Sequence, residues 1–124
     1  MITKARAVNI YVGDQQRALD FYTEKLGFEV RADDTSMPGM RWIEVAPPGA
    51  ETSLILFTPQ GLEERIGAWS PVVFDSDDID ATYAELRDNG VEFSQPLEMQ
   101  PWGMKMAQFK DPDGNEFVLV QYQS

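Results

Sequence analysis

The side chains in this sequence that could act in catalysis or bind a metal carry mostly oxygen atoms, because histidine and cysteine do not occur in it. Imidazole is the commonest ligand for transition metals and the commonest acid or base near neutral pH. A metal site would therefore need oxygen ligands alone, and the plausible donors on or beside strands are Asn9, Glu44, Asp75 and Glu116. Because such scattered carboxylates are usually only solvated, we expect no metal and no cofactor.

Patterns typical of nucleophilic or phosphate-binding sites are also missing. A Ser-His-Asp or Cys-His set cannot form without histidine and cysteine. The stretch Pro47-Pro48-Gly49-Ala50 indicates a turn between strands, whereas a phosphate-binding loop leads into a helix. The acidic run at Asp75, Asp77 and Asp78 lies where a helix N-terminus favours carboxylates. No catalytic residue can be assigned from these patterns.

Large apolar side chains are the remaining candidates for recognising a ligand. Trp42, Trp69 and Trp102 lie on or beside predicted strands, with several methionines nearby. Aromatic residues and methionine commonly pack in a core. The stretch Gln100-Pro101-Trp102-Gly103-Met104 favours binding instead, because proline and glycine place the indole at the start of a strand. Core packing and ligand binding both stay open for these residues.

Composition limits the class of protein. A chain of 124 residues with 43% hydrophobic content fits one domain with a core of its own. No apolar run approaches the ~20 residues that a membrane span needs, and we expect a cytoplasmic protein without disulfides. The net charge of −11 repels nucleic acid and anionic membranes. It would attract a cationic partner, or it serves solubility alone.

Hydrophobic periodicity predicts the elements of the first half. Residues Ala5 to Val12 alternate as a strand, with Asn9 and Tyr11 on one face. Asp14 is a suitable N-cap for a helix over Gln15–Leu26, which Gly27 would end. Three strands are expected next, at residues 28–30, 40–45 and 52–58, with a polar loop at 33–39.

The second half repeats the first with a shift of about 64 residues, since Val8 matches Val72 and Asp14 matches Asp78. We expect a single domain over residues 1–124, made of two βαβββ repeats at about 1–59 and 69–124, with a crossover at 60–68. The elements predicted for the second repeat are a helix over Ile79–Asn89 and strands at residues 71–74, 91–93, 102–110 and 116–122.

The turn Asp111-Pro112-Asp113-Gly114-Asn115 closes the last hairpin, because Pro112 fixes φ and Gly114 accepts a positive φ. This turn and the hydrophobic strand after it resemble the last strand of the vicinal oxygen chelate superfamily. The superfamily includes glyoxalase I, extradiol dioxygenases, fosfomycin-modifying enzymes and bleomycin-resistance proteins. The doubled unit, with Asp14, Phe21-Tyr22 and Leu26-Gly27-Phe28 in its first copy, extends the resemblance over essentially the whole chain.

The resemblance implies an α+β fold in which two tandem βαβββ modules form a cleft between curved sheets. In metal-using members, the first and last strands of each module offer ligands. Carried over by position, these ligands fall on Ala7 and Pro71 in the first strands, on Val118 in the last strand, and around Ser53 or Leu54 in copy one. None is a strong ligand, which again predicts no metal.

Three functions remain open. The first is a non-metal member of the superfamily that binds a small molecule, aromatic or cationic, as a drug-sequestering resistance protein. The second is a metal-dependent lyase or dioxygenase with a relocated metal site. The third is a structural or interaction domain whose own side chains close the cleft. Family members are commonly dimers, so we expect a homodimer that binds neither nucleic acid nor membrane.

Strand alternation predicts the ligand-binding residues of the first hypothesis. One face of each module should look into the cleft, and Val8, Ile10, Phe74, Phe117 and Leu119 should face the helices instead. The closing hairpin should add its residues at or near the rim. The predicted ligand-binding residues are Asn9, Tyr11, Asp75, Trp102, Met104, Met106 and Gln108, accompanied by Val73, Val118 and Val120.

Overall fold

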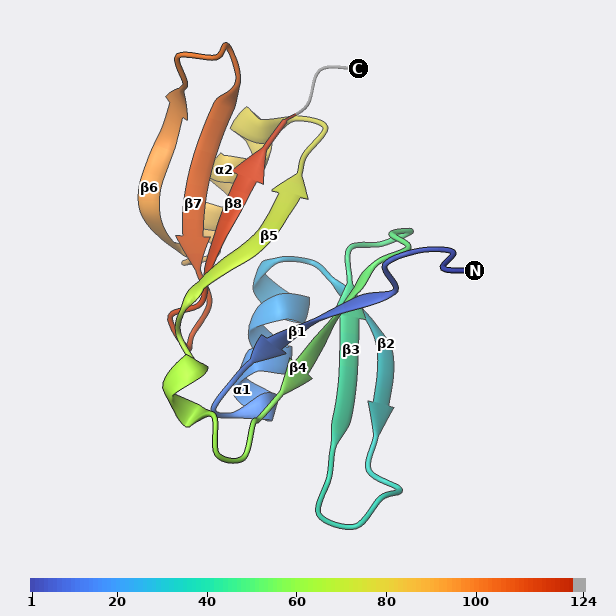
Figure 1. The fold of residues 1–124 in the computed structure, drawn as a ribbon. Coiled ribbons are helices and arrows are strands. Elements are labelled where there is room, and N and C mark those ends of the chain that lie inside the picture. The colour runs from blue at the N-terminus through green and yellow to red at the C-terminus, as the bar shows by residue number, and fades with distance from the viewer. Residues whose placement is uncertain (122–124) are drawn as a thin grey trace. The chain divides into compact units, whose positions relative to one another are not determined.

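A computed structural model describes residues 1–121 of the chain, with Pro71 described by its backbone alone (Figure 1). The chain forms two compact units, Met1–Ile66 and a second one that begins at Gly67. Each unit contains one four-stranded sheet and the helix that follows its first strand. The expected α+β fold with two βαβββ modules is confirmed.

The first unit is ordered β1-β4-β3-β2, with β1 parallel to β4 and the other neighbours antiparallel. Its helical segment packs on β3 and β4 through α1. The buried residues on that side of the sheet include Ile43, Val45, Leu54 and Leu56. The elements are β1 (Ala7–Tyr11), α1 (Gln15–Asp20), the π-helical turn η1 (Phe21–Lys25), β2 (Glu29–Asp34), β3 (Trp42–Ala46), β4 (Ser53–Phe57) and the 3₁₀ turn η2 (Glu63–Arg65).

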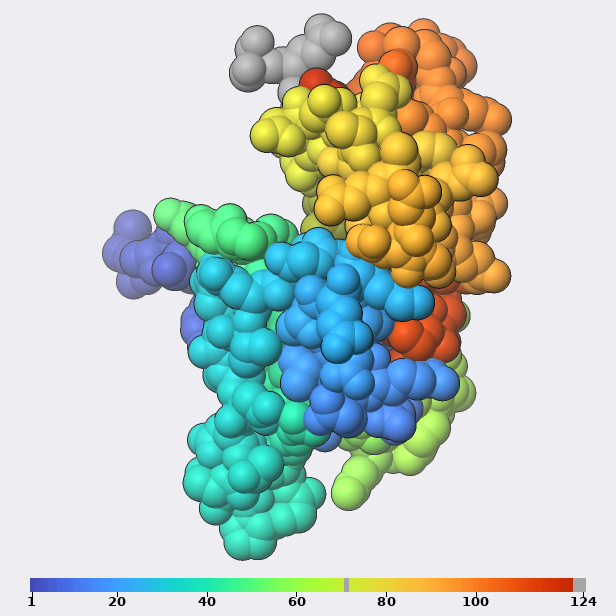
Figure 2. Space-filling view, turned by 180° about the vertical axis from the view of Figure 1, so that it is seen from behind, coloured from blue at the N-terminus to red at the C-terminus, as the bar shows by residue number. Residues whose placement is uncertain are grey.

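The second unit has the same topology, with the order β5-β8-β7-β6 and β5 parallel to β8. Its helix lies behind the sheet in Figure 1 and covers much of that unit's surface when the molecule is seen from behind in Figure 2. The elements are β5 (Trp69–Asp75), α2 (Ile79–Asp88), β6 (Glu92–Met99), β7 (Lys105–Lys110) and β8 (Glu116–Val120).

An aromatic cluster fills the space between α2 and its sheet. The ring of Tyr83 on α2 lies 4.6 Å from the ring of Phe93, which contacts Phe109 in turn. Phe74 and Phe117 complete the cluster, with ring centroids 5.3 Å apart. The prediction that Phe74 and Phe117 lie under the helix is therefore confirmed.

Both predicted helix caps are present. Asp14 Oδ1 accepts a hydrogen bond from the backbone N–H of Arg17 at 3.0 Å, and Asp78 Oδ1 accepts one from Ala81 at 3.2 Å. These bonds satisfy N–H groups that the first turn of a helix leaves without an internal partner. The acidic run before α2 thus contains a capping residue, as its position indicated.

The first helix differs from the regular helix expected over Gln15–Leu26. Its α-helical part ends at Asp20, and a π-helical turn continues to Lys25. In this turn the N–H of Leu26 donates to the carbonyl of Phe21, five residues back, and the N–H of Phe28 donates to Tyr22, six residues back. A π turn holds one more residue than an α turn. Periodicity alone did not reveal this extra residue.

Several strands also differ from their predicted bounds. β2 continues to Asp34, which pairs with Trp42, so part of the expected polar loop belongs to a hairpin. β6 runs to Met99 and pairs there with Lys105, so β7 begins three residues later than predicted and Trp102 lies in the hairpin turn. Polar residues at these strand ends suggested loops, but backbone pairing across long hairpins extends the strands.

The turn before β8 is held by the side chain of Asp111. Its Oδ1 accepts hydrogen bonds from the backbone N–H groups of Asp113 and Asn115, and its Oδ2 accepts one from Asn115 Nδ2 at 2.8 Å. Asn115 Oδ1 in turn accepts a bond from the N–H of Gly67. Asp111 and Asn115 are both buried. The turn therefore ties the start of the second unit to its last hairpin.

Candidate functional site

The face of the second sheet opposite α2 brings several predicted site residues together. Val120 pairs with Asp75 on one side and with Met106 on the other. One step along, Val118 pairs with Val73 and Gln108. Directly paired residues in a sheet point to the same face. We call this surface, formed by Val73, Asp75, Met106, Gln108, Val118 and Val120, the β5–β8–β7 face.

This face combines buried and exposed apolar groups. Val118 and Val120 are buried, whereas Val73 is 48% exposed. Trp69 pairs with Glu116 at the far end of the same strands and is 62% exposed. A valine and an indole are thus left open on β5, where a ligand or a partner could cover them.

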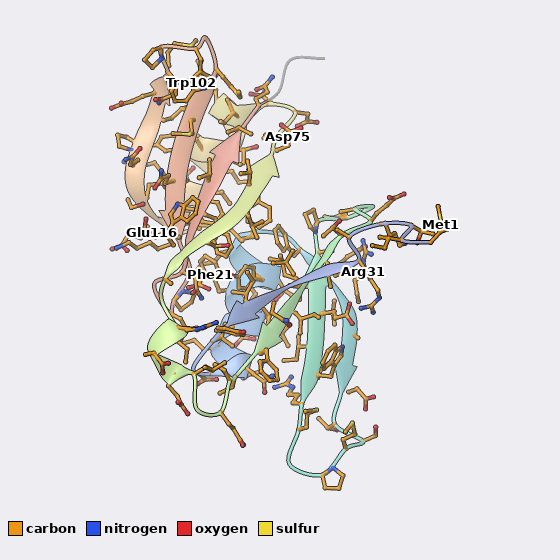
Figure 3. The ribbon with its side chains drawn as sticks, in the orientation of Figure 1. Met1, Phe21, Arg31, Asp75, Trp102 and Glu116 are labelled. Carbon is orange, nitrogen blue, oxygen red and sulfur yellow. The ribbon has the colours of Figure 1, made fainter. Side chains whose placement is uncertain are left out.

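Trp102 lies beyond the end of this face, in the turn between β6 and β7 (Figure 3). It is 63% exposed, so the interpretation of this residue as ordinary core is wrong for the isolated chain. The turn is closed by the N–H of Gly103, which donates to the carbonyl of Gln100 at 2.9 Å. The Pro-Trp-Gly pattern therefore presents its indole outward, as its turn residues indicated.

The corresponding face of the first sheet carries Asn9 and Tyr11. Asn9 pairs with Ile55, which pairs with Glu44 across the sheet, and Tyr11 pairs with Phe57. The rings of Tyr11 and Phe57 are 6.3 Å apart and tilted. Asn9 is exposed and Tyr11 is half-buried. This face therefore also combines polar and aromatic groups.

Glu44 is a buried carboxylate on this first-unit face, only 4% exposed. Its Oε2 accepts hydrogen bonds from Arg6 Nη2 and from the indole Nε1 of Trp42, each at 2.8 Å. Burial by itself would raise the pKa of Glu44, but the bonds from Trp42 and Arg6 and the charge of Arg6 outweigh it and lower this pKa below its ordinary value. Glu44 is therefore ionised and has partners within its own unit.

The predicted site residues lie in three places. Asp75, Met106 and Gln108 lie together on the β5–β8–β7 face. Met106 and Gln108 belong to the face itself, although the sequence placed them at the rim. Trp102 and Met104 lie at the hairpin end, while Asn9 and Tyr11 belong to the first unit. Whether these residues bind a ligand stays a prediction.

A cavity of about 330 Å³ lies at the other side of this hairpin. Met104 is the only predicted site residue in its lining, and sequence reasoning missed the others. Pairing of Met99 with Lys105 and packing of the α2 start against the hairpin create this space, and no local pattern reports either contact. The lining residues are Ile79, Asp80, Met99, Gly103, Met104, Lys105 and Gln121.

A family model described as the glyoxalase/bleomycin resistance protein/dioxygenase superfamily matches residues 4–119. The chain belongs to this superfamily. The glyoxalase-superfamily chain is 43% identical to the uncharacterized protein YetH of Bacillus subtilis (strain 168), a match that covers 98% of this chain and all of YetH.

Solved structures of the superfamily agree closely with this fold. A member from Sphaerobacter thermophilus is 41% identical, with a TM-score of 0.90 and 98% of both chains covered. TnmS3, described as an antibiotic binding protein from Streptomyces sp. CB03234, is 36% identical, with a TM-score of 0.85 and 98% of both chains covered. These similarities extend over both units of the glyoxalase-superfamily chain.

The residues at the superfamily's metal-ligand positions do not fit a metal. Ala7 pairs with Ser53, and Val118 occupies the last-strand position of the second unit. Val118 pairs with Val73, and the residue equivalent to Val73 in the first unit is Asn9, which pairs with Ile55. The first-unit counterpart of Val118 is therefore Ile55, one residue beyond the expected Leu54. Alanine, isoleucine and valine side chains offer no donor atom. Among residues 1–121, no group of three or more acidic residues is placed to hold an ion.

Proposed function

We propose that this glyoxalase-superfamily chain binds a planar aromatic small molecule without a metal and retains it unchanged, as a sequestering protein does. The observation that carries this proposal is the exposed aromatic and apolar surface around the β5–β8–β7 face, where Val73, Trp69 and Trp102 remain open. The similarity to TnmS3, an antibiotic binding protein, supports the same conclusion.

The chemistry of this surface suits an aromatic cation. Val73, Val118 and Met106 offer apolar contacts, and Asp75 and Gln108 add two polar groups that could orient the ligand. Small-molecule sites commonly have such a mostly apolar lining with few oriented polar groups. The carboxylate of Asp75 attracts a positive charge, and the Trp102 indole can stack on an aromatic ring. Asn9 and Tyr11 lie on the corresponding face of the first unit and stay predicted ligand-binding residues of that unit.

We also propose that the protein acts as a homodimer. The exposed side chains of Val73, Trp69 and Trp102 are apolar groups that a partner would remove from water. A second copy or a ligand could cover them, and sedimentation of the protein with and without ligand separates the two. A dimer that forms without ligand supports assembly, whereas a monomer at micromolar concentration in both states contradicts it.

The test uses proflavine, a planar cationic dye whose fluorescence reports binding. Replacing Trp102 with alanine should weaken its affinity by about 1–3 kcal/mol, the value of stacking a base on an aromatic side chain. Asp75→Asn should weaken proflavine further and make its binding less sensitive to salt. Trp102→Phe is the matched control, because it keeps an aromatic ring at the same position and should therefore keep most of the stacking.

The outcomes separate the proposed function from its alternatives. If neither Trp102→Ala nor Asp75→Asn changes the affinity for proflavine, the result would contradict a ligand site on this surface. A dye or substrate that binds only after a divalent metal is added would favour a metal-dependent lyase or dioxygenase. Failure of a broad panel of aromatic cations to bind would favour an interaction domain.

A further inference from the structure

The cavity on the α2 side of the second unit is a separate feature, and we propose that it binds a small aromatic ammonium ion. It lies between the first turn of α2 and the end of the β6–β7 hairpin, with a volume of about 330 Å³. Of its lining residues, only Met104 was also predicted from the sequence to bind a ligand, and none belongs to the β5–β8–β7 face. The inference therefore stands independently of the proposed function.

The apolar part of the cavity suits one aromatic ring. Ile79 lines the cavity and is buried, while Met99 and Met104 supply thioether side chains. Sulfur atoms of methionine make favourable contacts with aromatic rings, and the flexible side chain adapts to different shapes. Gly103, at φ +88°, leaves the hairpin turn without a side chain on this lining. The volume is near the lower end of ligand pockets, which fits a single ring with a short chain.

The polar part of the cavity is an ion pair that a ligand can join. Lys105 Nζ donates to both carboxylate oxygens of Asp80, each at 2.9 Å. The Asp80 side chain is 63% exposed, and a carboxylate has about four acceptor sites, so it retains capacity for a second cation. Gln121 is already engaged, because its Oε1 accepts a hydrogen bond from the N–H of Ile79 at 2.8 Å.

The surrounding charge favours a cation over an anion. Arg87, Lys105 and Lys110 are the cationic side chains from Gly67 onward, and acidic side chains outnumber them. Asp77 and Asp78 immediately precede the cavity residues of α2. With a net charge of −11 on the chain, the field concentrates small cations near its surface. An ammonium group beside Asp80 would share this carboxylate with Lys105, whereas a ligand carboxylate would be repelled.

Methyl resonances of the methionines test this site directly. The protein is labelled with ¹³C at the methionine methyl groups and titrated with 2-phenylethylammonium, with neutral 2-phenylethanol and anionic phenylacetate as matched probes. We expect the Met99 and Met104 resonances to shift and the cation to bind more tightly than either analogue. Unshifted Met99 and Met104 resonances at millimolar cation would overturn the inference. A shift confined to Met106 would also overturn it, because Met106 reports the β5–β8–β7 face.

Two variants that remove one charge each decide the role of the ion pair. Asp80→Asn should weaken 2-phenylethylammonium about two- to five-fold, as expected for an exposed charge contact. Lys105→Gln should strengthen it by a similar factor, because the competing cation is gone. Neither variant should change 2-phenylethanol binding. Weaker cation binding in Lys105→Gln, or stronger binding of phenylacetate than of the cation to the wild type, would overturn the inference.

A further control separates this site from the proposed function. Asp75→Asn should leave the Met99 and Met104 shifts unchanged while it weakens proflavine. Loss of both responses in Asp75→Asn would mean one common site and would overturn the inference. If Asp80→Asn loosens the start of α2, measured as a loss of helical circular dichroism, Lys105→Gln still decides the question, since Lys105 lies on β7.

Discussion

Replacing Asp111 with alanine should severely destabilise the second unit. Asp111 accepts three hydrogen bonds at 2.8–3.0 Å, one from the backbone of Asp113 and two from Asn115. Asn115 is only 5% exposed, so two of its donors would lose this acceptor in a buried position. Each such loss costs about 1–3 kcal/mol, which gives a total of about 2–6 kcal/mol. The whole free energy of unfolding of a domain is about 5–15 kcal/mol, so this loss is a large part of it.

Urea unfolding, followed by circular dichroism and tryptophan fluorescence, measures this effect as a change in midpoint at constant slope. Asp111→Asn is the matched control. It keeps Oδ1 as an acceptor for the two backbone N–H groups and loses only the acceptor for Asn115 Nδ2. We therefore expect it to cost about half as much as alanine. A loss below about 0.5 kcal/mol for Asp111→Ala, the usual range of surface changes, would refute the assigned role of this turn.

Three further results are expected. Gly67→Ala should cost more than Gly61→Ala in urea unfolding, because both glycines have φ above +80° but only at Gly67 would a Cβ lie 2.6 Å from the carbonyl oxygen of Asp113; equal costs would contradict this. Because the pKa of Glu44 is lowered in the folded state, its contribution to stability is complete above its ordinary pKa and is lost as the pH falls through the folded value. Arg6→Gln should therefore shrink the stability difference between neutral and acid pH, and an unchanged pH profile would contradict that coupling. Chelator or added Ni²⁺, Mn²⁺ or Zn²⁺ should leave the melting temperature unchanged, whereas a saturable increase would reveal a metal site.

The fold followed from local patterns because each pattern has a local physical cause. Asp14 and Asp78 cap their helices through hydrogen bonds that span only three residues. Alternation along β5 and β8 separates Phe74 and Phe117, which pack under α2, from Val73 on the other face. The repeat of both signals along the chain then indicated two similar modules.

The candidate site was predicted less completely, because its contacts join residues far apart in the sequence. Exposure of Trp102 could be inferred from its turn residues, but the ion pair of the buried Glu44 joins it to Arg6, 38 residues away. The cavity beside α2 arises where Lys105 reaches Asp80, a pairing that no spacing along the chain reveals. Sequence reasoning therefore found single residues and missed the partners that hold them.

The π turn in the first helix accounts for a difference in length between the two modules. Gly27 lies thirteen residues after the N-cap Asp14, whereas Gly90 lies twelve residues after the N-cap Asp78. Both glycines nevertheless end their helices with a positive φ. Accordingly, the N–H of Phe28 reaches back six residues, whereas that of Val91 reaches back five, to Leu86. The first module thus stores one surplus residue inside its helix.

The effect of the surplus residue on the sheet depends on whether it lies in a helix or in a strand. One residue added within a strand would turn every later side chain of that strand to the opposite face and remove the match between the modules. One residue added within a helix widens a single turn and leaves the following strand in phase. Duplicated modules of this kind can therefore change in length by single residues through their helices, while their sheets keep the alternation on which both core and surface depend.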